Sequence, residues 1–239
     1  MDRNIFLVMM AAGSGVRMGT SRPKQFIELE GKPILRLSIE KFIEACPGIR
    51  VVTVLPPDHI QEWKDYCIGS GFIYPQILVS GGITRFHSVR NALEKVPDGA
   101  IVAIHDGVRP FISVGLIRAL FSRMSVCRAV IPVVPCVDTL KFLKKDKTGE
   151  GAEVLSRIDG MASDRSETYF AQTPQIFLSE DMKSSYEGAY DTSFTDDASV
   201  AEKNNIPLTY VAGERLNFKI TTPEDLTLGR AILAFKGGK

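Results

Sequence analysis

The sequence has 239 residues, with 44% hydrophobic and 24% charged side chains and a formal net charge of +1. This balance disfavours a general nucleic-acid binder, which is usually strongly basic, and no apolar run approaches the roughly 18 residues of a membrane span. The four cysteines are scattered, and the three histidines show no metal-ligand spacing. We therefore expect a cytoplasmic protein with reduced thiols.

The first predicted element is a strand over Ile5–Met10, whose continuous apolar run is typical of a strand that is buried on both faces. We prefer this interpretation to a signal peptide, because the run is short and leads into a loop that carries Arg and Lys.

Strand-like and helix-like segments then alternate. Leu35, Ile39 and Phe42 recur at helical spacing after Pro33 and predict a helix. Further helices are predicted around residues 60–67, 89–96 and 113–124, and further strands over 51–55, 76–80, 100–104 and 129–134. This alternation predicts an α/β fold with a mostly parallel sheet that is flanked by helices.

The alternation breaks at Pro135. In the next segment, strand-like pieces flank KKDKTGEG, which has the charge and glycines of an exposed turn. We predict one domain over residues 1–239 with a protruding β-hairpin arm at about 137–165. The arm is either a plain surface hairpin or a structure that grips a second subunit.

Beyond the arm, the pattern predicts a strand over 168–177 and a helix with Thr195 as its N-cap. Short strands are predicted in LTYV and LNFKIT, and a last helix begins at the cap Thr222.

The most informative stretch is AAGSGVRMGTSRPKQF, directly after the first strand. The spacing of Gly13, Gly15 and Gly19 is not the dinucleotide fingerprint, because the third glycine comes one residue late, and no Gly-Lys-Ser/Thr of a P-loop follows. The glycine spacing alone favours a plain strand–helix turn. The cations Arg17 and Lys24 shift the balance toward a triphosphate site, since such a loop can wrap an anion with its N–H groups.

Two further residues are candidates from their positions. Asp106 follows the predicted strand over 100–104, and ligands collect at the carboxyl ends of strands in open parallel sheets. The alternative is a simple turn former. Lys219 lies between Phe218 and Ile220 in a predicted strand and should point opposite to them, toward either a ligand or solvent.

The loop AAGSGVRMGTSRPKQF resembles the nucleotide loop of the IspD-like nucleotidylyltransferases. Further similar motifs follow in order: GGITRFHSV (81–89), HDGVRP (105–110), VDTLK (137–141), DR (164–165), QTPQIF (172–177), TDDAS (195–199) and NFKITTPEDL (217–226). Each motif is weak alone, but the ordered set covers nearly the whole chain. The sequence departs from the family at Met10, where Pro or a small residue is common, and in a longer arm around KTGEG.

The resemblance implies a Rossmann-like fold of the nucleotide-diphospho-sugar transferase type. It also implies transfer of CMP from CTP to 2-C-methyl-D-erythritol 4-phosphate, which releases diphosphate and forms 4-CDP-2-C-methyl-D-erythritol in non-mevalonate isoprenoid biosynthesis. The attacking phosphate is already an anion, so catalysis should rest on positioning and electrostatics. Alternatives are transfer to ribitol 5-phosphate, transfer to a sugar 1-phosphate, and a catalytically silent nucleotide-binding protein.

The resemblance further implies roles for single residues. The cations expected at the reacting phosphates are Arg17, Lys24, Arg165 and Lys219. The residues expected to bind CTP are Ala11, Ala12, Gly13, Ser14, Gly15, Gly81, Arg85, Ser88, Asp106 and Gly107. Those expected to hold the alditol phosphate are Thr139, Arg165, Thr173 and Lys219. Asp106 would also hold Mg²⁺, mainly together with CTP phosphates, and arm residues would reach the neighbouring site of a homodimer.

Overall fold

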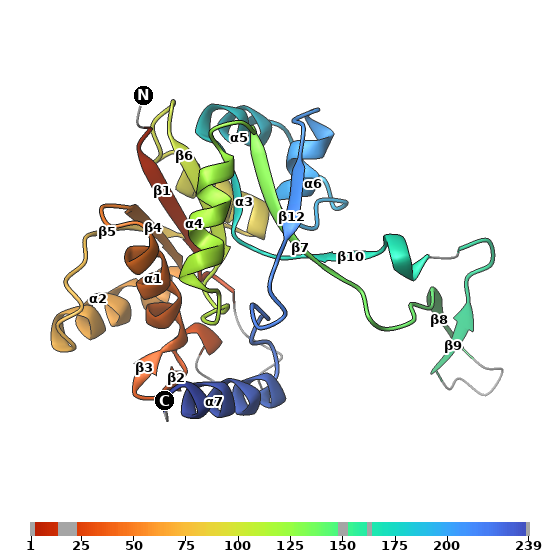
Figure 1. Ribbon diagram of the computed structural model, residues 1–239, viewed down its shortest axis with the longest axis horizontal. Helices are drawn as coiled ribbons and strands as arrows, with labels where there is room; N and C mark the ends of the chain where they lie inside the picture. Colours follow the sequence, from red (N-terminus) through yellow and green to blue (C-terminus); the bar gives the residue numbers. More distant parts are fainter. Residues whose placement is uncertain (1–2, 14–22, 148–152, 162–163, 238–239) are drawn as a thin grey trace.

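The computed structural model describes residues 3–13, 23–147, 153–161 and 164–237 (Figure 1). An eight-stranded sheet forms its centre, in the order β10-β7-β11-β6-β1-β4-β5, with β12 also paired to β7. The strands are β1 (Ile5–Met10), β4 (Arg50–Leu55), β5 (Gln76–Ser80), β6 (Ile101–Asp106), β7 (Ala129–Pro135), β10 (Tyr169–Ala171), β11 (Gln175–Leu178) and β12 (Thr209–Ala212).

The sheet is mostly parallel, as predicted. β1 pairs in parallel with β4 and β6, β4 with β5, and β12 with β7, whereas β10 and β11 run antiparallel to their neighbours. Because β1, β4, β5 and β6 are parallel, their carboxyl ends meet at one edge of the sheet, where the predicted ligand residues follow them.

Helices cover both faces of the sheet because the strand side chains alternate. Leu7 and Met9 of β1 pack in one core with α1 (Ile34–Ala45), α2 (Ile60–Gly69) and α4 (Val114–Arg123). Phe6 and Val8 pack in a second core with α3 (Arg85–Leu93), α5 (Ser179–Glu187) and α6 (Asp197–Lys203). This is why the run Ile5–Met10 is apolar at every position.

A third, smaller core holds the last helix, α7 (Pro223–Gly237). Leu29, Phe111 and Ile220 are buried there, and Leu226 and Ile232 of α7 pack against them. The remaining elements near this region are short: η2 (Lys24–Phe26), β2 (Glu28–Leu29), β3 (Lys32–Pro33) and η3 (Pro57–His59).

The predicted arm is a β-hairpin. β8 (Leu143–Lys147) and β9 (Glu153–Arg157) pair antiparallel in a separate two-stranded sheet, and η4 (Arg165–Glu167) lies at its return to β10. Figure 1 shows the arm extending away from the central sheet. Several of its apolar side chains are exposed, with Leu155 at 67% of its full surface.

Several elements differ from the predictions. The expected strand over 168–177 is two strands, β10 and β11, separated by residues 172–174. Helix α5 was not predicted because its sequence SEDMKSSYE is mostly polar. The N-cap of α6 is Asp196, not Thr195, because the Asp196 carboxylate accepts from the Ser199 backbone N–H in a capping box. Residues 217–220 form no strand, although Ile220 is fully buried.

Within the described residues, no helix combines the length and the apolar character needed to cross a membrane.

Candidate active site

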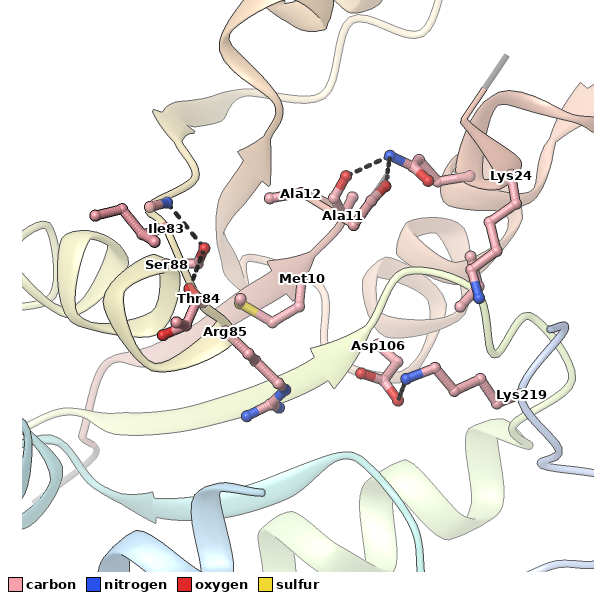
Figure 2. A pocket seen from close by; sticks show the side chains of 14 residues that line it. Met10, Ala11, Ala12, Lys24, Ile83, Thr84, Arg85, Ser88, Asp106 and Lys219 are labelled. Atoms are coloured by element: carbon pink, nitrogen blue, oxygen red, sulfur yellow. Dashed lines mark hydrogen bonds and ion pairs between the residues drawn. The ribbon is translucent and has the colours of Figure 1, made fainter. Parts of the chain in front are cut away.

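A pocket of about 530 Å³ opens where β1, β5 and β6 end (Figure 2). It collects residues from four separate motifs, because the strand order brings the segments that follow β1, β5 and β6 to the same edge of the sheet. The predicted residues that line it are Ala11, Ala12, Gly13, Lys24, Arg85, Ser88, Asp106 and Lys219. Residues that line it without having been predicted are Met10, Gln25, Gly82, Ile83, Thr84 and Val108.

Asp106, the last residue of β6, carries the negative charge of the pocket. Its Oδ2 lies 3.1 Å from Lys219 Nζ and 3.1 Å from Arg109 Nε. Figure 2 shows the Lys219 side chain reaching to Asp106, with a dashed line for their ion pair. Both cations lie closest to the same carboxylate oxygen, and Oδ1 accepts no hydrogen bond from another described residue.

The charge state of Asp106 follows from these partners. Burial alone would raise the pKa of the Asp106 carboxyl, but the positive charges of Lys219, Arg109 and Arg85 outweigh burial and hold this pKa well below its usual range. The carboxylate is therefore ionised at neutral pH and cannot serve as a proton donor there.

His105 lies beside Asp106 but points into the core. Its side chain is fully buried and packs against Phe42, with ring centroids 4.9 Å apart. Burial lowers the pKa of His105 to about 4, so the ring is neutral at neutral pH.

The hydrogen bonds of His105 assign its tautomer. Nε2 lies 3.3 Å from the Arg109 carbonyl, which can only accept, so Nε2 carries the proton. Nδ1 therefore accepts from the Thr173 hydroxyl at 3.0 Å, and that hydroxyl in turn accepts from the Asp106 backbone N–H at 3.1 Å. This chain of bonds holds the end of β6 in place.

Lys24 is positioned by the two residues that follow it in the chain. It begins η2, where Lys24 is only 9% exposed. Gln25 next to it is buried, and its Nε2 donates to the carbonyls of Ala11 at 2.6 Å and Gly13 at 3.2 Å. Phe26 is buried in the core beside Trp63. The amide of Gln25 thus joins Lys24 to the backbone that follows β1.

The segment after β5 is shaped by two glycines. A Cβ at Gly81 would lie 2.4 Å from the Cβ of Ala12, so only glycine lets these two loops approach this closely. The Gly82 N–H donates to Ser88 Oγ at 2.9 Å, and that hydroxyl donates to the Thr84 carbonyl at 2.9 Å. The predicted residue Ser88 therefore orders the turn as well as lining the pocket.

Arg85 reaches the pocket from the first turn of α3. Its guanidinium donates from Nη1 and Nη2 to the two carboxylate oxygens of Asp197, at 2.7 and 2.6 Å. Burial opposes the charged form, but Asp197 outweighs it and raises the pKa of Arg85 further. The guanidinium is thus permanently charged and firmly oriented.

Other predicted residues do not line the pocket. Thr173 and Gly107 are buried, and the Gly107 carbonyl accepts from Ser38 at 3.1 Å. Thr139 and Arg165 are exposed at the base of the arm, where Arg165 donates to the Val137 carbonyl at 3.4 Å. Three predicted residues, Ser14, Gly15 and Arg17, lie outside the described residues.

Five of the six pocket residues that the prediction missed lie inside motifs it had identified, and the sixth, Met10, directly precedes one. Gly82, Ile83 and Thr84 sit between predicted members of GGITRFHSV, and Gln25 is adjacent to Lys24. Their place in the sequence could have suggested them. Asp197, which holds Arg85, is buried and lies 112 residues away, so only the folded chain reveals the pair.

No group of three or more His, Cys, Asp or Glu side chains in the described ranges is arranged to hold a metal ion.

A family model described as 2-C-methyl-D-erythritol 4-phosphate cytidylyltransferase (IspD) matches residues 5–235. A protein of that name from Bacteroides fragilis is 40% identical over 226 residues, which cover 95% of this chain and 98% of the relative. One from Porphyromonas gingivalis is 39% identical over 234 residues, covering 98% and 99%.

Solved structures are similar along the same length. The crystal structure of 4-diphosphocytidyl-2C-methyl-D-erythritol synthase from Anaerococcus prevotii has a TM-score of 0.75 at 26% identity and covers 97% of this chain and 99% of its own. That of 2-C-methyl-D-erythritol 4-phosphate cytidylyltransferase from Francisella tularensis has a TM-score of 0.74 at 26% identity, covering 95% and 99%.

Proposed function

The chain belongs to the 2-C-methyl-D-erythritol 4-phosphate cytidylyltransferase family, and from this premise we propose how its pocket carries out the reaction. The enzyme transfers CMP from CTP to 2-C-methyl-D-erythritol 4-phosphate, releases diphosphate and forms 4-CDP-2-C-methyl-D-erythritol for isoprenoid biosynthesis. The observation that carries our assignment of roles is the convergence of Lys24, Asp106 and Lys219 on one pocket.

In the proposed mechanism, a phosphate oxygen of the acceptor attacks the α-phosphorus of CTP, and the bond to the diphosphate breaks. Lys24 and Lys219 act on the negative charge that grows on the phosphoryl group, because preorganised cations stabilise a transition state without reorganising. Arg17, which lies in the same motif as Lys24, is proposed to act with them. Ala11, Ala12 and Gly13, with Gly81 and Ser88, bind the nucleotide.

The proposed mechanism needs no general base, and the pocket supports this. The titratable side chains that line it, within the described ranges, are Lys24, Arg85, Asp106 and Lys219. Asp106 is held ionised by its cations, so it is a weak base, and His105 is buried with both ring nitrogens bonded. The chain's contribution is therefore positioning and electrostatics.

We propose Mg²⁺ as the cofactor, held by Asp106 together with CTP phosphates. Mg²⁺ usually takes one or two carboxylates plus phosphate oxygens, and Asp106 fits because it is ionised and its Oδ1 accepts no hydrogen bond from another described residue. When bound, the ion would neutralise phosphate charge.

We also propose that the active unit is a homodimer. Thr139 and Arg165 are exposed and do not line the pocket of their own chain, although the family resemblance gives them to the acceptor phosphate. An arm that reaches a neighbouring subunit's pocket would explain how these exposed residues hold the acceptor phosphate. Twofold symmetry would then place each subunit's arm at the other subunit's pocket. Thr173 is buried and does not line the pocket, so we propose that it serves the acceptor site indirectly, through its hydrogen bonds to His105 and to the Asp106 backbone.

The four cysteines are free, which agrees with the proposed cytoplasmic location.

The experiment is a diphosphate-release assay with four nucleoside triphosphates against a panel of alditol phosphates and sugar 1-phosphates. We expect the highest kcat/KM with CTP and methylerythritol 4-phosphate. A higher value with ribitol 5-phosphate would reassign the acceptor. Efficient turnover of UTP or ATP with a sugar 1-phosphate would contradict both the base and the acceptor.

A further inference from the structure

The pair formed by Arg85 and Asp197 joins the pocket to the interior. Asp197 is fully buried, whereas one third of the Arg85 side chain is exposed and lines the pocket. In Figure 2, Arg85 extends past Met10 toward the side of the pocket where Asp106 lies. The charge of Arg85 also contributes to lowering the pKa of Asp106. The pair thus has one buried member and one member that faces ligand space.

Asp197 is itself fixed by neighbouring elements. The Tyr186 hydroxyl of α5 donates to Asp197 Oδ1 at 2.6 Å, and the Tyr186 ring stacks on Phe86 with centroids 4.5 Å apart. The start of α6 is held by Gln175 of β11, whose Oε1 accepts from the Ala198 N–H at 2.8 Å. The carboxylate therefore has little freedom to move away from Arg85.

The pairing with Asp197 leaves some N–H groups of the Arg85 guanidinium without a hydrogen bond to the described residues. A guanidinium carries five N–H donors, and Arg85 gives one from Nη1 and one from Nη2 to Asp197. Its other donors make no hydrogen bond to the described residues. Because Asp197 holds the guanidinium in place, these donors form a fixed, polar edge on a side chain that lines the pocket.

We propose that Asp197 is a positioning residue for the transfer reaction: it holds the Arg85 guanidinium against the pocket so that the free N–H edge binds oxygen atoms of a bound substrate. Tyr186 supports this role by orienting the carboxylate. The proposal rests on the proposed function for the identity of the substrates. It does not require Arg85 to touch the reacting phosphate.

The test is a double-mutant cycle with Arg85→Ala, Asp197→Asn and the double variant. KM is measured with CTP and the acceptor varied separately, and CTP binding is also measured by calorimetry without acceptor. We expect Asp197→Asn to raise the KM for at least one substrate about tenfold, the scale of a charge-assisted hydrogen bond. The double variant should be no worse than Arg85→Ala, because Asp197 acts through Arg85.

Fully additive losses would overturn the proposal, since they would mean that Asp197 acts independently of Arg85. Unchanged KM values for both substrates in Asp197→Asn would also overturn it. A wild-type enzyme that binds CTP but transfers CMP to no alditol phosphate would instead contradict the proposed function. CTP binding measured by calorimetry in the wild type and the three variants would still test the role of Asp197.

Two further variants separate positioning from folding. Tyr186→Phe keeps the Arg85–Asp197 pair but removes the orienting hydroxyl; we expect a smaller KM increase that disappears in the Arg85→Ala background. Should Asp197→Asn fail to fold, this second cycle decides, and a persisting effect in Arg85→Ala would overturn the proposal. Asp181→Asn breaks a comparable pair with Arg128 away from the pocket and should leave both KM values unchanged.

Discussion

Lys24 combines a charge with unusually low exposure for a lysine, which is what a residue acting on a phosphoryl group requires. We expect Lys24→Met, which keeps the length and apolar stem, to lower kcat by on the order of 10²–10³, by analogy with the loss of one preorganised donor. CTP binding, measured by calorimetry, should weaken less than turnover.

The matched control is Lys64→Met, which removes an exposed lysine of α2 and should leave kcat unchanged. An unaltered kcat in Lys24→Met would rule out the role in the transition state.

His105 makes stability depend on pH. Burial lowers its pKa to about 4, whereas the pKa of an unfolded histidine is about 6.5. Between these values the unfolded chain binds a proton that the folded chain does not, so stability falls as the pH drops from about 6.5 to about 4. The loss is at most about 3 kcal/mol from this group.

Urea denaturation of the wild type and His105→Gln at pH 7 and pH 4.5 measures this effect. We expect the variant to be less stable at pH 7, because it disrupts the bonds to Thr173 and Arg109, yet to lose less stability on acidification. Equal losses in the two proteins would contradict the assignment.

At the scale of elements, the pocket depends on the close approach of two loops. The loops after β1 and β5 meet at Ala12 and Gly81, where an added methyl group would fall far inside van der Waals contact. We expect Gly81→Ala to displace Ala12 and to raise the KM for CTP about tenfold, with a loss of about 1–3 kcal/mol in stability from overpacking.

Gly115→Ala in α4 is the control, since its added Cβ would lie 3.6 Å from the nearest atom, Ser113 Oγ, and a helix favours alanine. It should leave the KM for CTP unchanged. A similar KM for CTP in the wild type and Gly81→Ala would show that the contact is not needed for binding.

At the scale of the whole molecule, the arm is the feature that the monomer does not explain. It exposes Leu143, Val154 and Leu155, and it carries Thr139 and Arg165 at its base. Apolar surface that projects from the main body favours a partner, because burial would remove it from water. A second copy of the chain would provide this cover and receive the two polar residues.

Subunit mixing tests the shared site. Lys24→Ala and Thr139→Ala are each expected to be inactive, but in a mixed dimer one site would carry both lesions and the other neither. With free exchange, roughly a quarter of wild-type activity should return, since half of the dimers are mixed and each has one intact site. No recovery after verified exchange, or a fully active monomer by light scattering, would contradict the shared site.

Much of the fold could be predicted from local patterns. The unbroken apolar run Ile5–Met10 indicated a doubly covered strand, and helical spacing around Ile39 indicated α1; both are present. The polar, glycine-bearing sequence after Pro135 indicated the hairpin. These features depend on residues close together in the sequence, where periodicity and turn chemistry act directly.

The motifs also determined most of the pocket wall, because strands that run parallel bring their carboxyl ends, and the loops that follow, to one edge. Sequence patterns failed where long-range contacts override local preference. The polar α5 is held by Met182 and Tyr186 against the second core. The residues around Ile220 form no strand, because the Ile220 N–H donates to the Val108 carbonyl in the turn after β6 rather than to a strand of the sheet.

Only the tertiary structure decided which charges meet. Asp106 joins a lysine more than a hundred positions along the chain, and Arg85 is held by Asp197, 112 residues away. The sequence determined that cations and carboxylates follow the strands, and folding determined which of them pair. The physical reason is that burial makes an unpaired charge costly, so the packed chain must bring each buried carboxylate to a cation, whatever their separation in sequence.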